Sequence, residues 1–306
     1  MNRSYFEMHF AILLAGFSGI FGKLITLNET YLVFYRVLFS SAILILIVLF
    51  IKKNSSRKIS FSKSNLLLLA NGGLLALHWI FFFGSIKAST VSLGILCLSL
   101  ASFFTALLDP LINKSKLSIN NLILSSLSLI GIALIFGFDS TYREGIILGF
   151  ISSVLVSLFT IFNESLVKKH DTLKVTMLQM SGGSIVLAII ILFSTTFFDF
   201  QFKVPQGMNL VYLLILAIVC TVLMYTLLNR SLRTISSFTV NLNFNLEPIY
   251  GIILAFIIFN ESAGFNLAFW IGVTLIISSL ILQYVFSKPR KVVSADVQYK
   301  SIPKLE

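Results

Sequence analysis

Apolar residues fill most of this chain in long stretches, and short segments between them carry most of the charged residues. An α-helix needs about 20 consecutive apolar residues to cross the hydrocarbon of a bilayer. The pattern therefore predicts an all-α polytopic membrane protein with ten transmembrane helices, at about residues 8–27, 30–51, 65–86, 89–112, 118–138, 145–167, 173–198, 209–230, 236–259 and 264–287.

Two junctions between the predicted helices are very short. Only Asn28-Glu29 separates the first two apolar stretches, and only Lys87-Ala88 separates the third from the fourth. A nine-helix interpretation would merge one of these pairs. Because a merged run of about 40 residues is too long for one crossing, ten helices are favoured.

The basic residues give the orientation of the predicted helices. With the N-terminus in the cytoplasm, 18 of the 23 Lys and Arg residues fall in cytoplasmic segments, three fall outside, and Lys23 and Arg36 lie within spans. Positive residues accumulate on the cytoplasmic side of membrane proteins. We therefore expect both termini in the cytoplasm and a bacterial inner (plasma) membrane as the location, and we read the net charge of +11 as topology rather than nucleic-acid binding.

The composition agrees with a membrane protein and offers no sign of a cofactor. Hydrophobic residues make up 57% of the chain and charged residues 11%, against about 25% charged in soluble domains. Cys97 and Cys220 both lie in apolar segments, without disulfide or metal-ligand spacing. Phosphate-loop, dinucleotide and serine-hydrolase motifs are missing from the sequence, so we expect neither a cofactor nor a metal.

The two halves of the chain resemble each other weakly. A shift of 148 residues places "LSLASFFTALLDPLINKSKLS" over "LEPIYGIILAFIIFNESAGFN", with Ser99 on Glu247. Ten helices divide into five and five, and a repeat with an odd number of spans places its second copy upside down. We therefore predict two inverted repeats, residues 1–140 and 141–287, followed by a basic cytoplasmic tail, residues 288–306.

Several short motifs carry a resemblance to a known family. They are "GIFGK" at Gly19 to Lys23, "FYR" ending at Arg36, and "LEPIYGIILAFIIFNES" in the second half. With ten spans, the chain resembles the EamA family of the drug/metabolite transporter superfamily. The resemblance implies a transporter without ATPase domains, often an exporter of amino acids or other small metabolites. The first half has "LSLASFF" in place of "LEPIYG", so we expect the helix break only in the second half.

Glu247 is the leading candidate for a functional carboxylate. It lies near the middle of the ninth span, where a charged side chain costs a few kcal/mol and must face the protein interior or a cavity. It could bind substrate, carry a proton or only organise packing. Pro248 removes a backbone donor and could act as a hinge.

The segment "LALHWIFFFGSIKAS" in the third span is the best candidate for a cavity wall. His78 and Phe82 share one helix face, and Trp79 lies beside them. A histidine at this depth can titrate near neutral pH, and a tryptophan face binds cations or planar ligands. Alternatively, His78 bridges two helices and Trp79 packs or faces lipid.

Other polar residues complete the candidate set. Lys23 is a candidate for substrate binding or coupling, or it could snorkel to the interface. Arg36 could hold a carboxylate or phosphate, or pair with Glu29 or another residue. Asn163 is a further candidate for substrate binding, and Tyr225 either lines the path or packs in the core. Near the helix ends, three acids are expected to act as gate or helix-end groups: Asp109, Glu164 and Glu261.

The leading hypothesis is a secondary transporter that moves a small molecule across the bilayer by alternating access. Proton coupling and facilitated diffusion both stay open, as do the substrate, the direction and the oligomeric state. The alternatives are an integral-membrane lipid-modifying enzyme, which would usually need clustered acids or histidines at one interface, and a pore or sensor.

Overall fold

The computed structural model describes residues 3–51, 62–136, 142–197, 201–259 and 267–286. Its helices in chain order are α1 Arg3–Leu24, α2 Glu29–Ile51, α3 Lys63–Ala88, α4 Val91–Leu98, α5 Leu100–Asn113, α6 Ile119–Phe136, α7 Arg143–Val167, α8 Thr172–Phe197, α9 Met208–Ala217, a π-helical turn Ile218–Leu223, α10 Met224–Ser231, α11 Ser237–Asn243, a 3-10 turn Phe244–Leu246, α12 Glu247–Phe259 and α13 Leu267–Phe286.

The prediction of an all-helical membrane protein is confirmed. Within the described ranges, seven helical segments are long and apolar enough to cross a bilayer: Arg3–Leu24, Glu29–Phe50, Lys63–Ala88, Val91–Asn113, Arg143–Val167, Thr172–Phe197 and Met208–Ser231. The two short predicted junctions are true helix ends, because α1 ends before α2 begins and α3 ends before α4 begins. The full count of ten spans stays a prediction.

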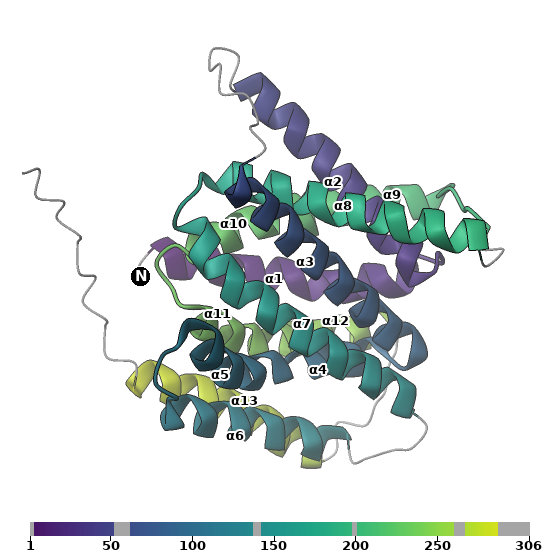
Figure 1. Ribbon diagram of the computed structural model, residues 1–306. Helices are drawn as coiled ribbons and strands as arrows, with labels where there is room; N and C mark the ends of the chain where they lie inside the picture. The colour runs from purple at the N-terminus through teal and green to yellow at the C-terminus, as the bar shows by residue number, and fades with distance from the viewer. Residues whose placement is uncertain (1–2, 52–61, 137–141, 198–200, 260–266, 287–306) are drawn as a thin grey trace, which may run out of the picture.

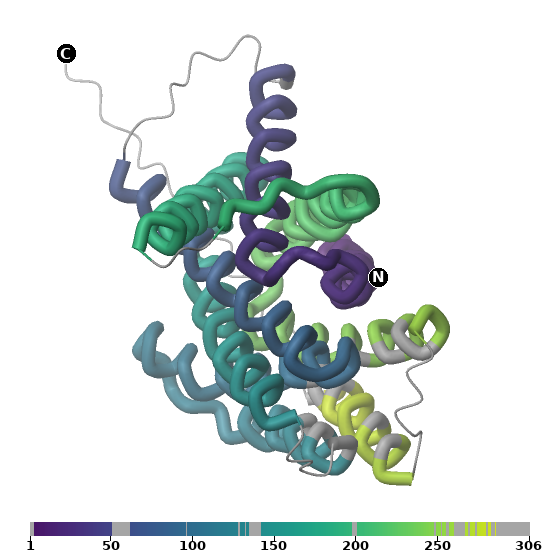
Figure 2. The backbone as a smooth tube through the Cα atoms, turned by 90° about the vertical axis from the view of Figure 1, so that its right-hand side faces the viewer, coloured from purple at the N-terminus to yellow at the C-terminus, as the bar shows by residue number. Residues whose placement is uncertain are grey.

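The helices form a bundle in which segments far apart in the sequence lie side by side (Figures 1 and 2). Helix α3 packs against α7 and α8, α1 packs against α10 and α12, and α6 pairs with α13. The pairings are reciprocal between the halves: α4 contacts α12 as α5 contacts α11. A core of buried apolar side chains lies mainly between α1, α2, α3, α8 and α10.

Two corresponding side-chain contacts each join a loop of one half to the start of a helix in the other half. The Asn209 amide at the start of α9 contacts Thr26 through two hydrogen bonds of 2.9 Å. In the corresponding contact, His170 takes the place of Thr26 and Ser64 that of Asn209. His170, in the α7–α8 loop, lies 2.5 Å from the hydroxyl of Ser64 at the start of α3. In both cases the loop before the second helix of a half joins the third helix of the other half.

Helix starts are also capped at matching places in the two halves. Asn28 accepts the backbone N–H of Tyr31 at the start of α2, and Asp171 accepts that of Lys174 at the start of α8. Such caps satisfy donors that the first helical turn leaves unpaired. The polar residues between the apolar stretches therefore set where several helices begin.

The expectation that only the second half contains a helix break is wrong. The helix is interrupted at Ser99, between α4 and α5, as well as at the 3-10 turn before α12. Serine hydroxyls from α7 accompany the first break: Ser153 donates to the carbonyl of Cys97 at 2.5 Å, and Ser157 to that of Ala101 at 2.8 Å. These side chains offer the backbone partners outside its own helix, which is how a break without proline is tolerated within a bilayer.

Helices α3 and α8 approach each other closely through two glycines. A Cβ atom added to Gly72 would lie 1.9 Å from the carbonyl oxygen of Gln179, and one added to Gly182 would lie 2.0 Å from that of Leu69. Small residues allow such backbone contact between membrane helices, where packing replaces the hydrophobic effect as the driving force.

Replacing Gly72 or Gly182 with alanine should therefore destabilise the protein, because the two backbones must separate. We expect a loss of about 1–3 kcal/mol per substitution, measured by thermal unfolding in detergent. Gly84→Ala is the matched control on α3, since its Cβ would meet only ordinary contacts, the nearest at 3.4 Å. Equal melting temperatures for Gly72→Ala and Gly84→Ala would contradict the close contact.

Candidate functional site

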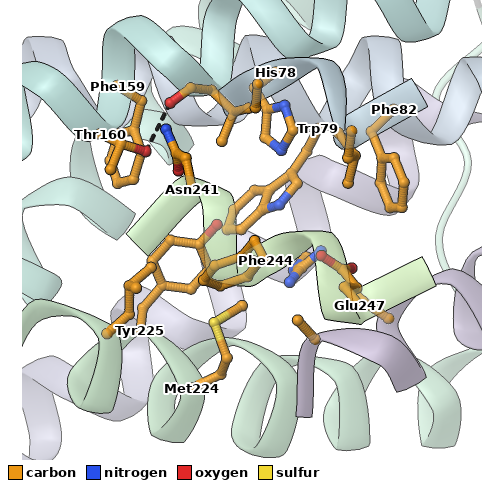
Figure 3. A pocket seen from close by; sticks show the side chains of 17 residues that line it. His78, Trp79, Phe82, Phe159, Thr160, Met224, Tyr225, Asn241, Phe244 and Glu247 are labelled. Carbon is orange, nitrogen blue, oxygen red and sulfur yellow. Dashed lines mark hydrogen bonds between the residues drawn. The ribbon is translucent and has the colours of Figure 1, made fainter. Parts of the chain in front are cut away.

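A cavity of about 60 Å³ lies inside the bundle, between helices of both halves. Its walls come from α1, α2, α3, α7 and α10, and from the segments next to the two helix breaks (Figure 3). Six of the residues predicted from the sequence line it together: Arg36, His78, Trp79, Phe82, Tyr225 and Glu247. The structure thus brings widely separated predicted residues to one place.

Arg36 is fully buried and is held rigidly by the π-helical turn between α9 and α10. Its Nε donates to Thr221 Oγ1 at 2.8 Å, and its Nη2 donates to the carbonyl oxygen of Cys220 at 2.9 Å. A π-helical turn shifts the backbone hydrogen-bond pattern, which is why such turns recur at functional sites. The partners of Arg36 are therefore Thr221 and Cys220 rather than Glu29.

The guanidinium group of Arg36 also stacks on an aromatic wall. It lies 3.8 Å from the ring centroid of Trp79, a typical cation–π arrangement. Trp79 in turn meets Tyr225 edge to face, with centroids 5.3 Å apart. With Nε and Nη2 bonded and one face covered, Nη1 is buried and has no hydrogen-bond partner among the residues that the structure describes. This leaves one strong charged donor available in the cavity wall.

Glu247 supplies a carboxyl group to the same cavity. It is the first residue of α12, is 4% exposed, and makes no hydrogen bond or ion pair with the part of the chain that the structure describes. It lines the same cavity as Arg36. The guanidinium of Arg36 in this cavity is a positive charge that can offset part of the cost of a carboxylate in the membrane.

Pro248 follows in the first turn of α12, where its missing N–H has no intrahelical partner to lose. The helix break therefore falls just before the proline, in the 3-10 turn Phe244–Leu246. A role for Pro248 as a hinge stays a prediction.

His78 lies on α3 and is 3% exposed. Its ring stacks on Phe82, with centroids 6.2 Å apart and planes 17° from parallel. Its Nδ1 contacts Ser152 on α7, at 3.0 Å from the carbonyl oxygen and 2.9 Å from the hydroxyl. Both interpretations of His78 therefore have support, since it bridges two helices and also lines the cavity.

Asn163 lies outside the cavity lining, in a buried network of polar side chains. It donates to Asn229 at 2.7 Å and accepts from Gln179 at 2.8 Å. Asn229 also donates to Thr176 and Gln179. These bonds join α7, α8 and α10, so the side chain of Asn163 is already occupied within the protein.

Replacing Asn163 with alanine should lower stability without changing the affinity of the cavity for ligand. The change leaves the buried amide groups of Gln179 and Asn229 without their hydrogen bonds to Asn163, at a cost of about 1–3 kcal/mol. Thermal unfolding measures the first effect, and ligand binding per folded molecule measures the second. A loss of affinity at unchanged stability would instead support the prediction that Asn163 binds substrate.

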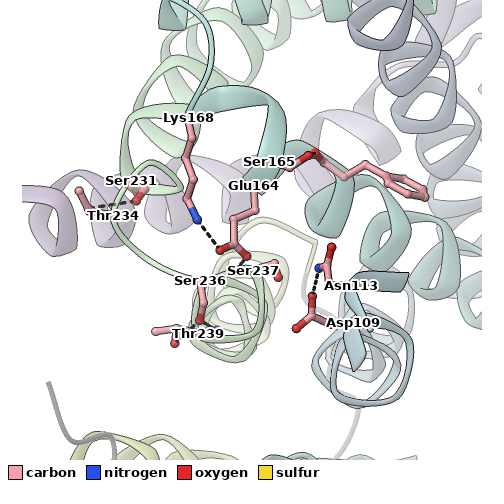
Figure 4. A network of polar contacts seen from close by, with 11 residues as sticks. Asp109, Asn113, Glu164, Ser165, Lys168, Ser231, Thr234, Ser236, Ser237 and Thr239 are labelled. Carbon is pink, nitrogen blue, oxygen red and sulfur yellow. Dashed lines mark hydrogen bonds and ion pairs between the residues drawn. The ribbon is translucent and has the colours of Figure 1, made fainter. Parts of the chain in front are cut away.

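Lys23 also lies outside the cavity lining, with its Nζ 4.5 Å from the ring centroid of Phe259. The predicted gate residues Asp109 and Glu164 lie at neighbouring helix ends (Figure 4). Asp109 accepts from Asn113 at 2.6 Å. Glu164 pairs with Lys168 at 2.8 Å and accepts the backbone N–H of Ser237, the first residue of α11, at 2.7 Å. Glu261 lies outside the described residues.

Several cavity residues were not predicted from the sequence: Ser18, Phe159, Thr160, Met224, Asn241 and Phe244. Asn241 had a signal, because its amide lies on the same apolar segment as Glu247; it donates to Thr105 at 2.7 Å. The aromatic and apolar members had none, since similar residues cover the lipid-facing surface.

Comparisons with known proteins identify the family and the fold. The model of the EamA-like transporter family matches residues 4–137 and again residues 143–285. An uncharacterized transporter, YxxF, of Bacillus subtilis (strain 168) is 28% identical over 254 residues, covering 81% of this chain and 79% of the relative. A crystal structure of a protein with 15% identity shares the fold with a TM-score of 0.68, covering 92% of this chain and 96% of that one. The family and the relative indicate a membrane transporter rather than an enzyme, and the chain belongs to the EamA-like transporter family.

Proposed function

We propose that this protein is a secondary transporter that moves a small metabolite bearing a carboxylate, such as an amino acid, by alternating access. The observation that carries the proposal is the unpartnered Nη1 of Arg36, anchored in a buried cavity that also holds the carboxylate of Glu247. A guanidinium fork suits a carboxylate, and a carboxylate suits an ammonium group. Ser18, whose buried hydroxyl also lacks a partner in the described part of the chain, adds a polar group to the wall.

The reciprocal contacts support ten spans arranged as two inverted repeats. Nearly the same shift in residue number relates Thr26 to His170, Ser64 to Asn209, and the cap Asn28 to the cap Asp171. In inverted-repeat transporters the substrate site lies between the repeats near the bilayer midplane. The cavity fits this description, because its walls come from both halves of the chain.

The excess of basic residues in one set of loops supports cytoplasmic termini and a place in the plasma membrane. Export from the cytoplasm is the proposed direction. Coupling to protons is proposed through Glu247 and His78, because a carboxyl group and an imidazole can each take up and release a proton.

The size of the cavity bears on how cargo enters. About 60 Å³ holds a few water molecules, far less than a typical ligand site. Ligand entry therefore requires the walls to separate. The segments next to Ser99 and the 3-10 turn Phe244–Leu246 are suited to this movement, because a broken helix can bend where a continuous one resists.

The test is a thermal-shift screen of the purified protein against amino acids and other carboxylate metabolites, followed by counterflow in proteoliposomes for each ligand found. We expect saturable counterflow that unlabelled ligand competes. Binding of lipid substrates with turnover, or flux without saturation, would contradict a transporter and favour an enzyme or a pore.

A further inference from the structure

The contact between His78 and Ser152 determines which ring nitrogen of the histidine carries the proton. Nδ1 lies 3.0 Å from the carbonyl oxygen of Ser152, which can only accept a hydrogen bond. The Ser152 hydroxyl donates to the carbonyl oxygen of His78 at 3.1 Å and lies 2.9 Å from Nδ1, where its oxygen accepts. The carbonyl contact therefore requires a proton on Nδ1, and the hydroxyl contact is compatible with it.

In a neutral imidazole, a proton on Nδ1 leaves Nε2 as an acceptor. Within the described residues, no hydrogen bond reaches Nε2. Because Nε2 is not among the fully buried polar atoms without a partner, part of its surface is accessible. His78 lines the cavity, and Figure 3 shows its ring beside Trp79 at the cavity wall. Stacking on Phe82 further limits rotation of the ring. Nε2 is thus the accessible acceptor of a residue that lines the cavity.

We propose that Ser152 is a positioning residue that fixes His78 as the Nδ1–H tautomer, so that Nε2 accepts a hydrogen bond from an N–H of the ligand. This inference rests on the proposed function. It divides the cavity into donors, on Arg36 and Ser18, and acceptors, on Nε2 of His78 and the carboxylate of Glu247. The cavity should therefore select a ligand amine that carries N–H groups over a fully N-methylated one.

The tautomer can be measured without any ligand. The chain has three histidines, so replacing His9 and His170 with glutamine leaves His78 as the single one. Nitrogen chemical shifts of ¹⁵N-histidine in this variant distinguish the two neutral tautomers and the imidazolium. We expect the Nδ1–H tautomer at pH 7. The Nε2–H tautomer or an imidazolium would overturn the proposal, whether or not transport is found.

The role of Ser152 is tested by Ser152→Ala in the same single-histidine background. We expect a measurable share of the Nε2–H tautomer, because one of the two acceptors for Nδ1–H is lost. Ser157→Ala is the matched control, since this serine lies on the same helix and bonds Ala101 instead. An unchanged tautomer in Ser152→Ala would overturn the role given to this side chain.

Two further variants separate anchoring from ligand contact. The amide nitrogen of asparagine can take the place of Nδ1, whereas that of glutamine lies nearer Nε2. We expect His78→Asn to melt close to the parent and His78→Gln to melt about 2–4 °C lower, the effect of one lost buried hydrogen bond. The reverse order would place the anchoring bond on Nε2 and overturn the proposal.

Discussion

Arg36→Gln should reduce the affinity for a carboxylate ligand by about 10- to 100-fold, because a charged hydrogen bond contributes about 1.5–3 kcal/mol. Glutamine keeps an amide donor but loses the charge and the stacking on Trp79. The change also removes the donors to Cys220 and Thr221, so we expect lower stability. Affinity is therefore measured by titration calorimetry on the folded fraction.

Arg143→Gln is the matched control for this prediction, since Arg143 is exposed at the start of α7. Arg36→Lys separates charge from geometry. Lysine keeps the positive charge but cannot form the planar fork, so we expect intermediate affinity. Full affinity in Arg36→Gln would show that the cavity arginine does not contact the ligand.

Glu247→Gln should lower counterflow at least about tenfold while leaving the melting temperature unchanged or higher. An amide of nearly the same shape cannot pair with an ammonium group, and the lost interaction is worth about 1.5–3 kcal/mol. Stability should not fall, because the lower cost of burying an amide in place of a carboxylate without a hydrogen bond offsets the lost attraction to Arg36.

Glu144→Gln, an exposed acid in the first turn of α7, is the control for Glu247→Gln. The double variant with Arg36→Gln tests whether the two charges interact, because the stability loss of Arg36→Gln should shrink when Glu247 is already neutral. If Glu247→Gln and His78→Ala both keep flux and its pH dependence, the cavity is not the transport site.

The sequence located much of the cavity because charges and aromatic hydrogen-bonding groups stand out in an apolar chain. Arg36, His78 and Glu247 are too costly to face lipid, so the membrane itself predicts that they point inward. Trp79 and Tyr225 were candidates because they lie near polar residues on the same helices, Trp79 next to His78 and Tyr225 four residues before Asn229.

The sequence could not predict how each polar group is satisfied. Asn163 looked like a ligand contact, but partners from two other helices occupy it. The π-helical turn Ile218–Leu223 and the break at Ser99 contain neither proline nor glycine, so no local pattern marked them. Phe159 and Met224 resemble lipid-facing residues in the sequence. Both the protein interior and the lipid exclude water, so the periodicity of apolar residues does not distinguish a buried helix face from a lipid-facing one.

Alternating access requires that one cavity opens to the two faces of the membrane in turn. Ser18 lines the cavity, and the only cysteines, Cys97 and Cys220, can be replaced with alanine. Ser18→Cys in that background is then exposed to a membrane-impermeant maleimide, in right-side-out and in inside-out vesicles. Alternating access predicts labelling from each face, with protection by ligand; labelling from one face alone would contradict it.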